Sequence, residues 1–240
     1  MHNIWFTSDT HFRHKPILQY MTRPWPTIEE HDEGLISLWN QYIKPGDVVY
    51  HLGDFSFSKT QEDVEYLLGR LHGCKHLILG NHDWDCTRKA SGWQQVTPYK
   101  EIKVGTQKVC LFHYRMVVWN KMHHGSWALH GHSHGSLPKN YNARTFDVGV
   151  DCWNFTPIHY DVVAKEMTLY GFKHVDYHGD PGRKYVPDPD DSPVDLHRAA
   201  KQGWVMAEPA LGETCQPPDI APPPVKTDSM ERPNLADPEL

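Results

Sequence analysis

The stretch from residue 48 to residue 54 reads VVYHLGD, and the stretch from residue 76 to residue 83 reads HLILGNHD. Each contains a short apolar run, rich in branched side chains, that ends at a glycine followed by a polar residue. This pattern is typical of a buried strand that ends in a turn. Similar runs occupy residues 4–6, 109–112 and 127–129. The sequence therefore predicts five buried strands, each followed directly by polar side chains.

Helical segments separate these strands. Residues 27–30 read TIEE, which is a capping box, and apolar residues then repeat at helical spacing as far as Ile43. The sequence KPG at residues 44–46 ends that helix. A second helix is predicted from Gln61 to Leu71. Because strands alternate with helices, we predict an α/β domain.

The composition limits the class of protein. The chain has 30 acidic and 24 basic residues, and its net charge is -6 with all 18 histidines neutral. Domains that bind nucleic-acid backbone usually carry a basic face, so a nucleic-acid partner is not favoured. A small anionic substrate remains compatible, because bound metal would bring positive charge.

The cysteines and the apolar segments indicate the compartment. Five cysteines, widely spaced and without a CxxC pair, fit reduced thiols better than a disulfide framework. The sequence has no run long enough to span a bilayer and no secretory segment at its start, so no membrane partner is expected. We expect a cytoplasmic protein.

The character of the chain changes near residue 177. Residues 1–177 read as one globular domain. Residues 178–240 are rich in proline and poor in large apolar side chains, so they are predicted to be extended or disordered. A binding role for this C-terminal segment stays open.

Five polar pieces follow the predicted strands. They are Asp9-Thr-His11, Gly53-Asp54, Gly80-Asn81-His82-Asp83, His113 and Gly131-His132-Ser133-His134. Strand carboxyl ends share one edge of an α/β sheet, so these pieces are expected to meet. Carboxylate, amide and imidazole ligands suit Mn, Fe, Ni, Co or Zn better than Ca. Each piece alone has an ordinary alternative, such as a turn or an exposed histidine, but five in succession favour a metal site.

Taken together, the pieces resemble the calcineurin-like metallophosphoesterases, whose pattern is D-x-H, G-D, G-N-H-D/E, H and G-H-x-H. The pattern is complete and in order over roughly residues 2–170. Flanking text such as SDTHFRHKPI and DVGVDCWN is similar to the small bacterial and phage branch of predicted phosphoesterases. The resemblance implies a four-layer αββα sandwich of two mixed β-sheets flanked by helices. Many members carry Asp or Arg where this chain has Phe57, which leaves substrate contacts at that position open.

The resemblance also implies a division of roles. Two divalent metal ions are expected, with manganese favoured and Fe, Ni, Co or Zn as alternatives. The expected ligands are Asp9, His11 and His134 for the first metal, Asn81, His113 and His132 for the second, and Asp54 as the bridge. A hydroxide shared by the metals would attack phosphorus. His82 is expected to assist the leaving group, with Asp83 fixing the tautomer of its ring.

Some choices among residues stay open. We prefer His113 as a ligand because it directly follows an apolar run. His130 is its main rival, since it lies two residues before His132 and would share a strand face with it. Around the mouth of the site, Arg13, Arg115 and Trp84 are candidate substrate contacts, although each could equally be an ordinary surface residue.

The expected function is hydrolysis of small phosphodiesters, including cyclic nucleotides, or of phosphomonoesters. One alternative is a metal-dependent nuclease acting on DNA or RNA. Another, from a different class, is a catalytically inactive scaffold of the same fold. Such a scaffold should show lost ligands, and the sequence retains all of them. The physiological substrate and the oligomeric state are left open by the sequence.

Overall fold

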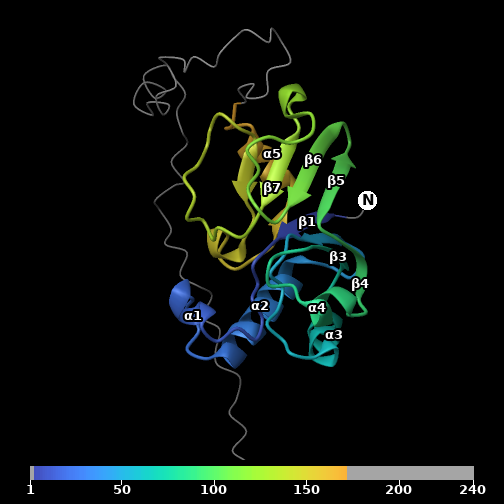
Figure 1. Ribbon diagram of the computed structural model, residues 1–240, viewed down its shortest axis with the longest axis vertical. Coiled ribbons are helices and arrows are strands. Elements are labelled where there is room, and N and C mark those ends of the chain that lie inside the picture. The colour runs from blue at the N-terminus through green and yellow to red at the C-terminus, as the bar shows by residue number, and fades with distance from the viewer. Residues whose placement is uncertain (1–2, 172–240) are drawn as a thin grey trace, which may run out of the picture. The chain divides into compact units, whose positions relative to one another are not determined.

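The computed structural model describes residues 3–171, which form two β-sheets with helices around them (Figure 1). The predicted domain boundary at residue 177 and the predicted extended or disordered segment of residues 178–240 lie outside the described residues. Within residues 3–171, no helix has both the length and the apolar character needed to cross a membrane.

The first sheet has the strand order β4-β3-β2-β1-β9. Its strands are β1 (Ile4–Thr7), β2 (Val48–His51), β3 (Cys74–Ile78), β4 (Trp93–Thr97) and β9 (Ile158–His159). Strands β1 to β4 are parallel, and β9 runs antiparallel to β1. In the parallel register Thr7 lies beside His51, which lies beside Leu77. The loops that follow β1, β2 and β3 therefore leave the sheet at the same edge.

The second sheet has the strand order β5-β6-β7-β8. Its strands are β5 (Tyr99–Val104), β6 (Gln107–Phe112), β7 (Trp127–His130) and β8 (Thr145–Asp147). Strands β5 and β6 form an antiparallel hairpin, whereas β6, β7 and β8 are parallel. The loops after β6, β7 and β8 therefore also share one edge of their sheet. Both sheets are mixed, as the resemblance implied.

The main apolar core lies between the two sheets. It contains Phe6 and Ile78 from the first sheet and Val109, Leu111 and Leu129 from the second, all of them 0% exposed. Burial of such side chains contributes roughly 1.5–3 kcal/mol each. Because the apolar runs predicted as strands pack against one another here, their carboxyl ends are brought to a common region.

Two longer helices cover the outer face of the first sheet. They are α2 (Ile28–Tyr42) and α3 (Gln61–Arg70), and both pack into a second core with Val49 of β2. Each helix begins at a threonine whose hydroxyl accepts a backbone N–H three residues later, at 3.2 Å in both cases. Such caps typically contribute about 1 kcal/mol. Both predicted helices are confirmed.

Shorter helices complete the described fold. They are α1 (Ile17–Tyr20), α4 (Asp85–Lys89), α5 (Tyr160–Met167) and the 3₁₀ helices η1 (Met122–His124) and η2 (Val150–Cys152). In Figure 1 the helices α2, α3 and α4 lie on the side of the first sheet that faces away from β5, β6 and β7. The outer face of the second sheet is covered by Trp119 and Met122 around η1. Two mixed sheets with flanking helices confirm the predicted fold class.

Candidate metal centre

The loops after the strands have an unusual backbone. Asp9, His11, Asp54, His132 and His134 all have φ between 47° and 67°, in the left-handed region. This conformation costs roughly 1–2 kcal/mol for a residue with a Cβ atom. Strain of this kind persists only where the surrounding structure imposes it, and it clusters at functional sites. These five residues all belong to the set predicted as metal ligands, and five other described non-glycine residues, among them Arg13, share this backbone conformation.

The first group consists of Asp9, His11 and His134, whose potential ligand atoms lie within 4.8 Å of one another. Oδ1 of Asp9 lies 4.0 Å from Nε2 of His11 and 3.9 Å from Nε2 of His134. Nε2 of His11 is buried and has no hydrogen-bond partner. Burial strongly lowers the pKa of this ring, which is therefore neutral. Unpaired buried polar atoms are rare, and a cation between these atoms would satisfy this one.

The second group consists of Asp54, His113 and His132, again with ligand atoms within 4.8 Å of one another. Nδ1–H of His113 donates to the carbonyl of Leu52 at 2.7 Å, and burial lowers the pKa of the ring. The lone pair on Nε2 therefore faces Oδ1 of Asn81, 3.0 Å away. Neither atom carries a hydrogen to donate, so these two ligand atoms fit a cation that lies between them.

Asp54 lies between the two groups. Its Oδ2 atom is 3.7 Å from Nε2 of His11 and 3.6 Å from Nε2 of His113. Its other oxygen, Oδ1, accepts the backbone N–H of His82 at 2.9 Å. One oxygen is thus held by the backbone, while the other faces a histidine from each group.

Neighbouring side chains hold two of the histidine rings. Nδ1 of His134 lies 2.6 Å from Oδ2 of Asp151, and Nδ1 of His11 lies 3.2 Å from Nδ1 of His14. Such outer partners fix the tautomer and orientation of metal-binding histidines. Burial alone would lower the pKa of His134, but the hydrogen bond to Asp151 and the charge of Asp9 outweigh it and raise the pKa.

Sequence reasoning did not single out Asp151. It lies in the DVGVDCWN stretch, shortly after β8, so its position after a strand was the available indication. It was not identified because its role requires Arg23 and His134, which are distant in sequence, to meet it in space.

The contacts of Asp83 differ from the role that the sequence predicted for it. Its carboxylate accepts the backbone N–H groups of Asp54, Phe55 and Gly80 at 2.8–3.0 Å. Burial raises its pKa to about 6. Both oxygens accept backbone N–H groups, and within residues 3–171 no hydrogen bond joins Asp83 to the ring of His82, so the expected fixing of its tautomer is not observed. Asp83 instead holds the loops after β2 and β3 together.

An aromatic wall, formed by Phe57, His82 and Trp84, lies beside the first group. The ring of Phe57 stacks on His14 at 3.6 Å between centroids and contacts His82 at 4.8 Å and Trp84 at 5.5 Å. His82 in turn lies 6.0 Å from His11. Trp84 is 37% exposed, and Nζ of Lys59 lies 4.4 Å from its ring. Phe57 thus joins His82 and Trp84 into one surface.

The two predicted arginines have other partners. Nη1 of Arg13 lies 3.5 Å from the carboxylate of Asp32, and Arg115 donates to the carbonyl of Pro138 at 2.9 Å. Arg115 also lines a cavity of about 330 Å³, next to Ser133 and Gly135. Within residues 3–171, neither guanidinium forms an ion pair or a hydrogen bond with either group.

His130, the rival to His113, belongs to neither group. Its Nδ1 atom lies 3.0 Å from the carbonyl of Gly131, and its side chain is buried. The structure therefore places His113 beside Asp54 and keeps His130 apart.

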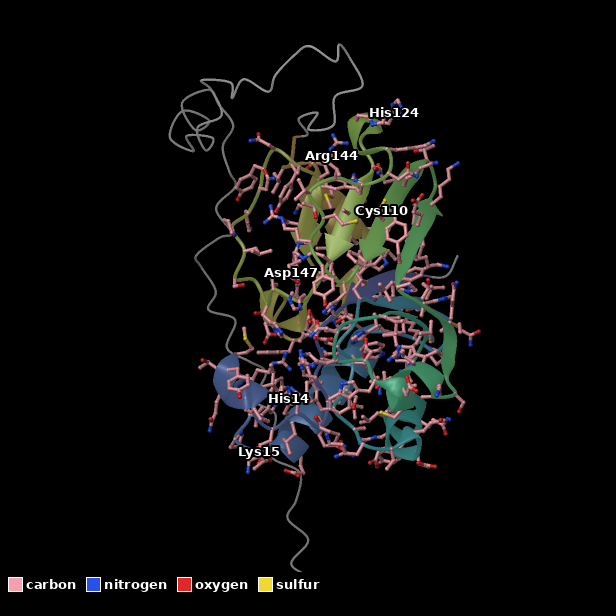
Figure 2. All side chains as sticks on the ribbon, in the orientation of Figure 1. His14, Lys15, Cys110, His124, Arg144 and Asp147 are labelled. Carbon is pink, nitrogen blue, oxygen red and sulfur yellow. The ribbon has the colours of Figure 1, made fainter. Side chains whose placement is uncertain are left out.

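In Figure 2, Asp147 at the end of β8 lies with the strands of the second sheet, and His14 lies beside the first sheet near α1. The candidate ligands follow strands of both sheets, with Asp54 after β2 of the first sheet and His113 after β6 of the second.

Comparisons with known proteins agree with this geometry. The family model described as calcineurin-like phosphoesterase matches residues 2–193. An uncharacterized protein of Methanocaldococcus jannaschii is 30% identical over 171 residues, covering 69% of this chain and 91% of the relative. The Gene 66 protein of Mycobacterium phage D29 is 32% identical over 184 residues, covering 64% of this chain and 90% of the relative.

A solved structure shows a similar fold. The crystal structure of a protein of unknown function from Aquifex aeolicus superposes with a TM-score of 0.56 at 21% identity. The match covers 69% of this chain and 100% of that protein. At this identity the likeness concerns the arrangement of the elements.

Proposed function

Because the chain belongs to the calcineurin-like phosphoesterase family, we propose that it hydrolyses phosphate esters at a dinuclear metal centre. The observation that carries this proposal is the position of Asp54. Its Oδ2 atom lies within 3.7 Å of a histidine nitrogen from each of the two groups. Two cations close together repel each other, and a carboxylate oxygen between them offsets that repulsion.

The ligands divide between two cations. Asp9, His11 and His134 would hold the first, Asn81, His113 and His132 would hold the second, and Asp54 would contact both. Oxygen and imidazole ligands without thiolate favour manganese, with Fe, Ni, Co and Zn as alternatives. When bound, the two cations would activate a water molecule for attack on phosphorus and neutralise the charge that develops on the phosphoryl oxygens.

His82 is the proposed acid for the leaving group. It follows the ligand Asn81, and its own backbone N–H is fixed on Oδ1 of Asp54 at 2.9 Å. The main chain therefore holds His82 beside the centre, while its side chain remains partly accessible against Phe57. In this position the imidazole can give a proton to the oxygen that departs from phosphorus.

The proposed substrates are small phosphodiesters, including cyclic nucleotides, or phosphomonoesters. Phe57 and Trp84 of the aromatic wall can stack against the flat part of an aryl or nucleoside leaving group. The net charge of -6 disfavours a long nucleic acid as the main substrate. A cytoplasmic location is part of this proposal and agrees with the free thiols of the four described cysteines.

One assay separates the candidate functions. The purified protein is freed of metal with a chelator, supplied with Mn²⁺, and offered an aryl phosphomonoester, an aryl phosphodiester, a cyclic nucleotide and single-stranded DNA. We expect turnover of one or more of the small esters that depends on Mn²⁺. Preferential cleavage of DNA would support the nuclease alternative. A protein that binds both metals and turns over none of the four would be the inactive scaffold.

A further inference from the structure

Arg23 lies between α1 and α2, outside all five motif pieces, and its side chain is 0% exposed. All five N–H donors of its guanidinium have an acceptor. The acceptors are Oδ1 and Oδ2 of Asp151 at 2.9 and 2.8 Å, the carbonyl of Asp9 at 2.7 Å, the carbonyl of Thr10 at 2.8 Å and Nε2 of His31 at 2.8 Å. Burying an unpaired cation is costly, so the burial of this guanidinium depends on the pairing of all its donors.

One side of this arrangement reaches His134. Arg23 grips both oxygens of Asp151, and Oδ2 of Asp151 also accepts Nδ1–H of His134 at 2.6 Å. A bidentate pair between arginine and carboxylate fixes the plane of the carboxylate as well as its position. The direction of Nδ1–H, and with it the direction of Nε2 toward Asp9, therefore depends on Arg23.

The other side holds the loop that carries Asp9 and His11. Both residues have left-handed backbone, with φ of 58° and 52°. Arg23 binds the carbonyls of Asp9 and Thr10, which lie within this strained segment. These two charge-assisted hydrogen bonds oppose relaxation of the loop.

A second chain of hydrogen bonds connects Arg23 to Arg13, at the end of the same loop. Because Nε2 of His31 accepts from Arg23, its Nδ1–H donates to Oδ1 of Asp32 at 2.9 Å. Asp32 in turn accepts the backbone N–H of Arg13 at 3.3 Å, and Arg13 has φ of 63°. The network that begins at Arg23 therefore supports both ends of residues 9–13.

We infer that Arg23 is a positioning residue for the first metal group, acting through Asp151 on His134 and through two carbonyls on the loop of Asp9 and His11. This inference rests on the proposed function, because it assumes that the group binds a metal. Within the described residues, no hydrogen bond or ion pair joins Arg23 to the side chains of the second group, which are Asp54, His113 and His132. Loss of Arg23 should therefore weaken one metal site selectively.

The test uses Arg23→Lys and Asp151→Asn in the full chain. Lysine keeps the charge but has three donors and no planar fork, so it cannot serve all five acceptors. Asparagine keeps the shape of Asp151 but removes the charge that pairs with Arg23. The matched control is Arg70→Lys, because Arg70 forms a bidentate pair with Glu33 on the surface formed by α2 and α3.

Metal-free protein is titrated with Mn²⁺ by calorimetry, and the fold of each variant is checked by circular dichroism. For Arg23→Lys and Asp151→Asn we expect one of two binding events to weaken by about 10–100-fold, the range found for outer partners of metal ligands. The other event should remain close to that of the wild type. Arg70→Lys should leave both unchanged.

Several outcomes would overturn the inference. It fails if the folded Arg23→Lys and Asp151→Asn proteins bind both metals like the control, or if both events weaken equally. If only Arg23→Lys fails to fold, Asp151→Asn decides by the same criteria. If neither variant folds, Arg23 is a folding element and the inference is wrong. A wild-type protein that binds no Mn²⁺ would contradict the proposed function itself, and this inference with it.

Discussion

The two carboxylate oxygens of Asp54 have different partners. Oδ1 accepts the N–H of His82, and Oδ2 faces both histidine groups. Asp54→Asn keeps the shape and can keep the first contact, but the amide has no charge and only one acceptor oxygen. We expect both metals to be lost or greatly weakened, and turnover to fall by more than about 100-fold.

Metal analysis after dialysis measures this effect. The control is Asp85→Asn, because Asp85 is exposed and pairs with Lys89 on the surface of α4. Full retention of one metal ion by Asp54→Asn would contradict the bridging role.

His82 provides a test of mechanism. His82→Ala should keep both metals, because the ring is not among the proposed ligands. Turnover should fall by roughly 100- to 10,000-fold, the usual contribution of a general acid. The loss should be small for nitrophenyl esters, whose leaving groups need little protonation, and large for alkyl or nucleoside esters. Equal losses for both kinds of ester, measured with metals in place, would show that His82 does not protonate the leaving group.

The choice between His113 and His130 shows how far local patterns reach. His113 follows β6 directly and lies beside Asp54, as its position predicted. The argument for His130 assumed that it shares a strand face with His132. Strand β7 ends at His130, and His132 has φ of 67°, so the two-residue alternation stops between them. The pattern of a strand predicts side-chain direction only as far as the strand continues.

The loops that hold the ligands also require close approach of the backbone. Gly53 has φ of +96°, and a Cβ atom there would lie 2.6 Å from the backbone of Gly80 and from Nδ1 of His113. Gly53→Ala should therefore lower the free energy of unfolding by more than about 2 kcal/mol, through strain and overpacking.

Urea denaturation of the metal-free protein measures this change without a contribution from metal binding. Gly69 in α3 is the control, because a Cβ atom there has nothing within 4 Å. Gly69→Ala should raise the free energy of unfolding by about 0.5–1 kcal/mol. A Gly53→Ala protein as stable as the wild type would show that the two loops can move apart.

The elements differ in how well the sequence predicted them. Helices α2 and α3 carry threonine caps and a regular apolar face, so their local patterns are strong. Strand β5 reads YKEIKV and is half exposed, and β9 has two residues, so neither forms an apolar run. Both strands exist because neighbouring strands supply hydrogen-bond partners, and this cause is not local in the sequence.

The C-terminal segment can be tested by truncation. The proposed ligands all lie between Asp9 and His134, and the family match ends at residue 193. A protein that consists of residues 1–193 should therefore keep its fold and most of its kcat/KM. Circular dichroism and steady-state kinetics measure both properties. Loss of folding or of most of the turnover would show that residues 194–240 serve the catalytic domain.

For the molecule as a whole, the five motif pieces predicted the meeting of strand ends and hence the location of the site. They did not predict the network around Arg23, because its members come from five separate segments, and Arg23 and Asp151 lie outside the motif pieces. Sequence patterns identify functional residues that directly follow strands. Supporting residues such as Arg23 and Asp151 become visible only when the packing of both sheets is known.

The most direct test of the proposed centre is a crystal structure of the protein grown with Mn²⁺, with anomalous diffraction measured near the manganese edge. The account predicts two anomalous peaks about 3.5–4 Å apart, the usual spacing in two-metal sites. One peak should contact Asp9, His11 and His134, the other Asn81, His113 and His132, and Asp54 should contact both. A single peak, or peaks that Asp54 does not join, would contradict a dinuclear centre at this site.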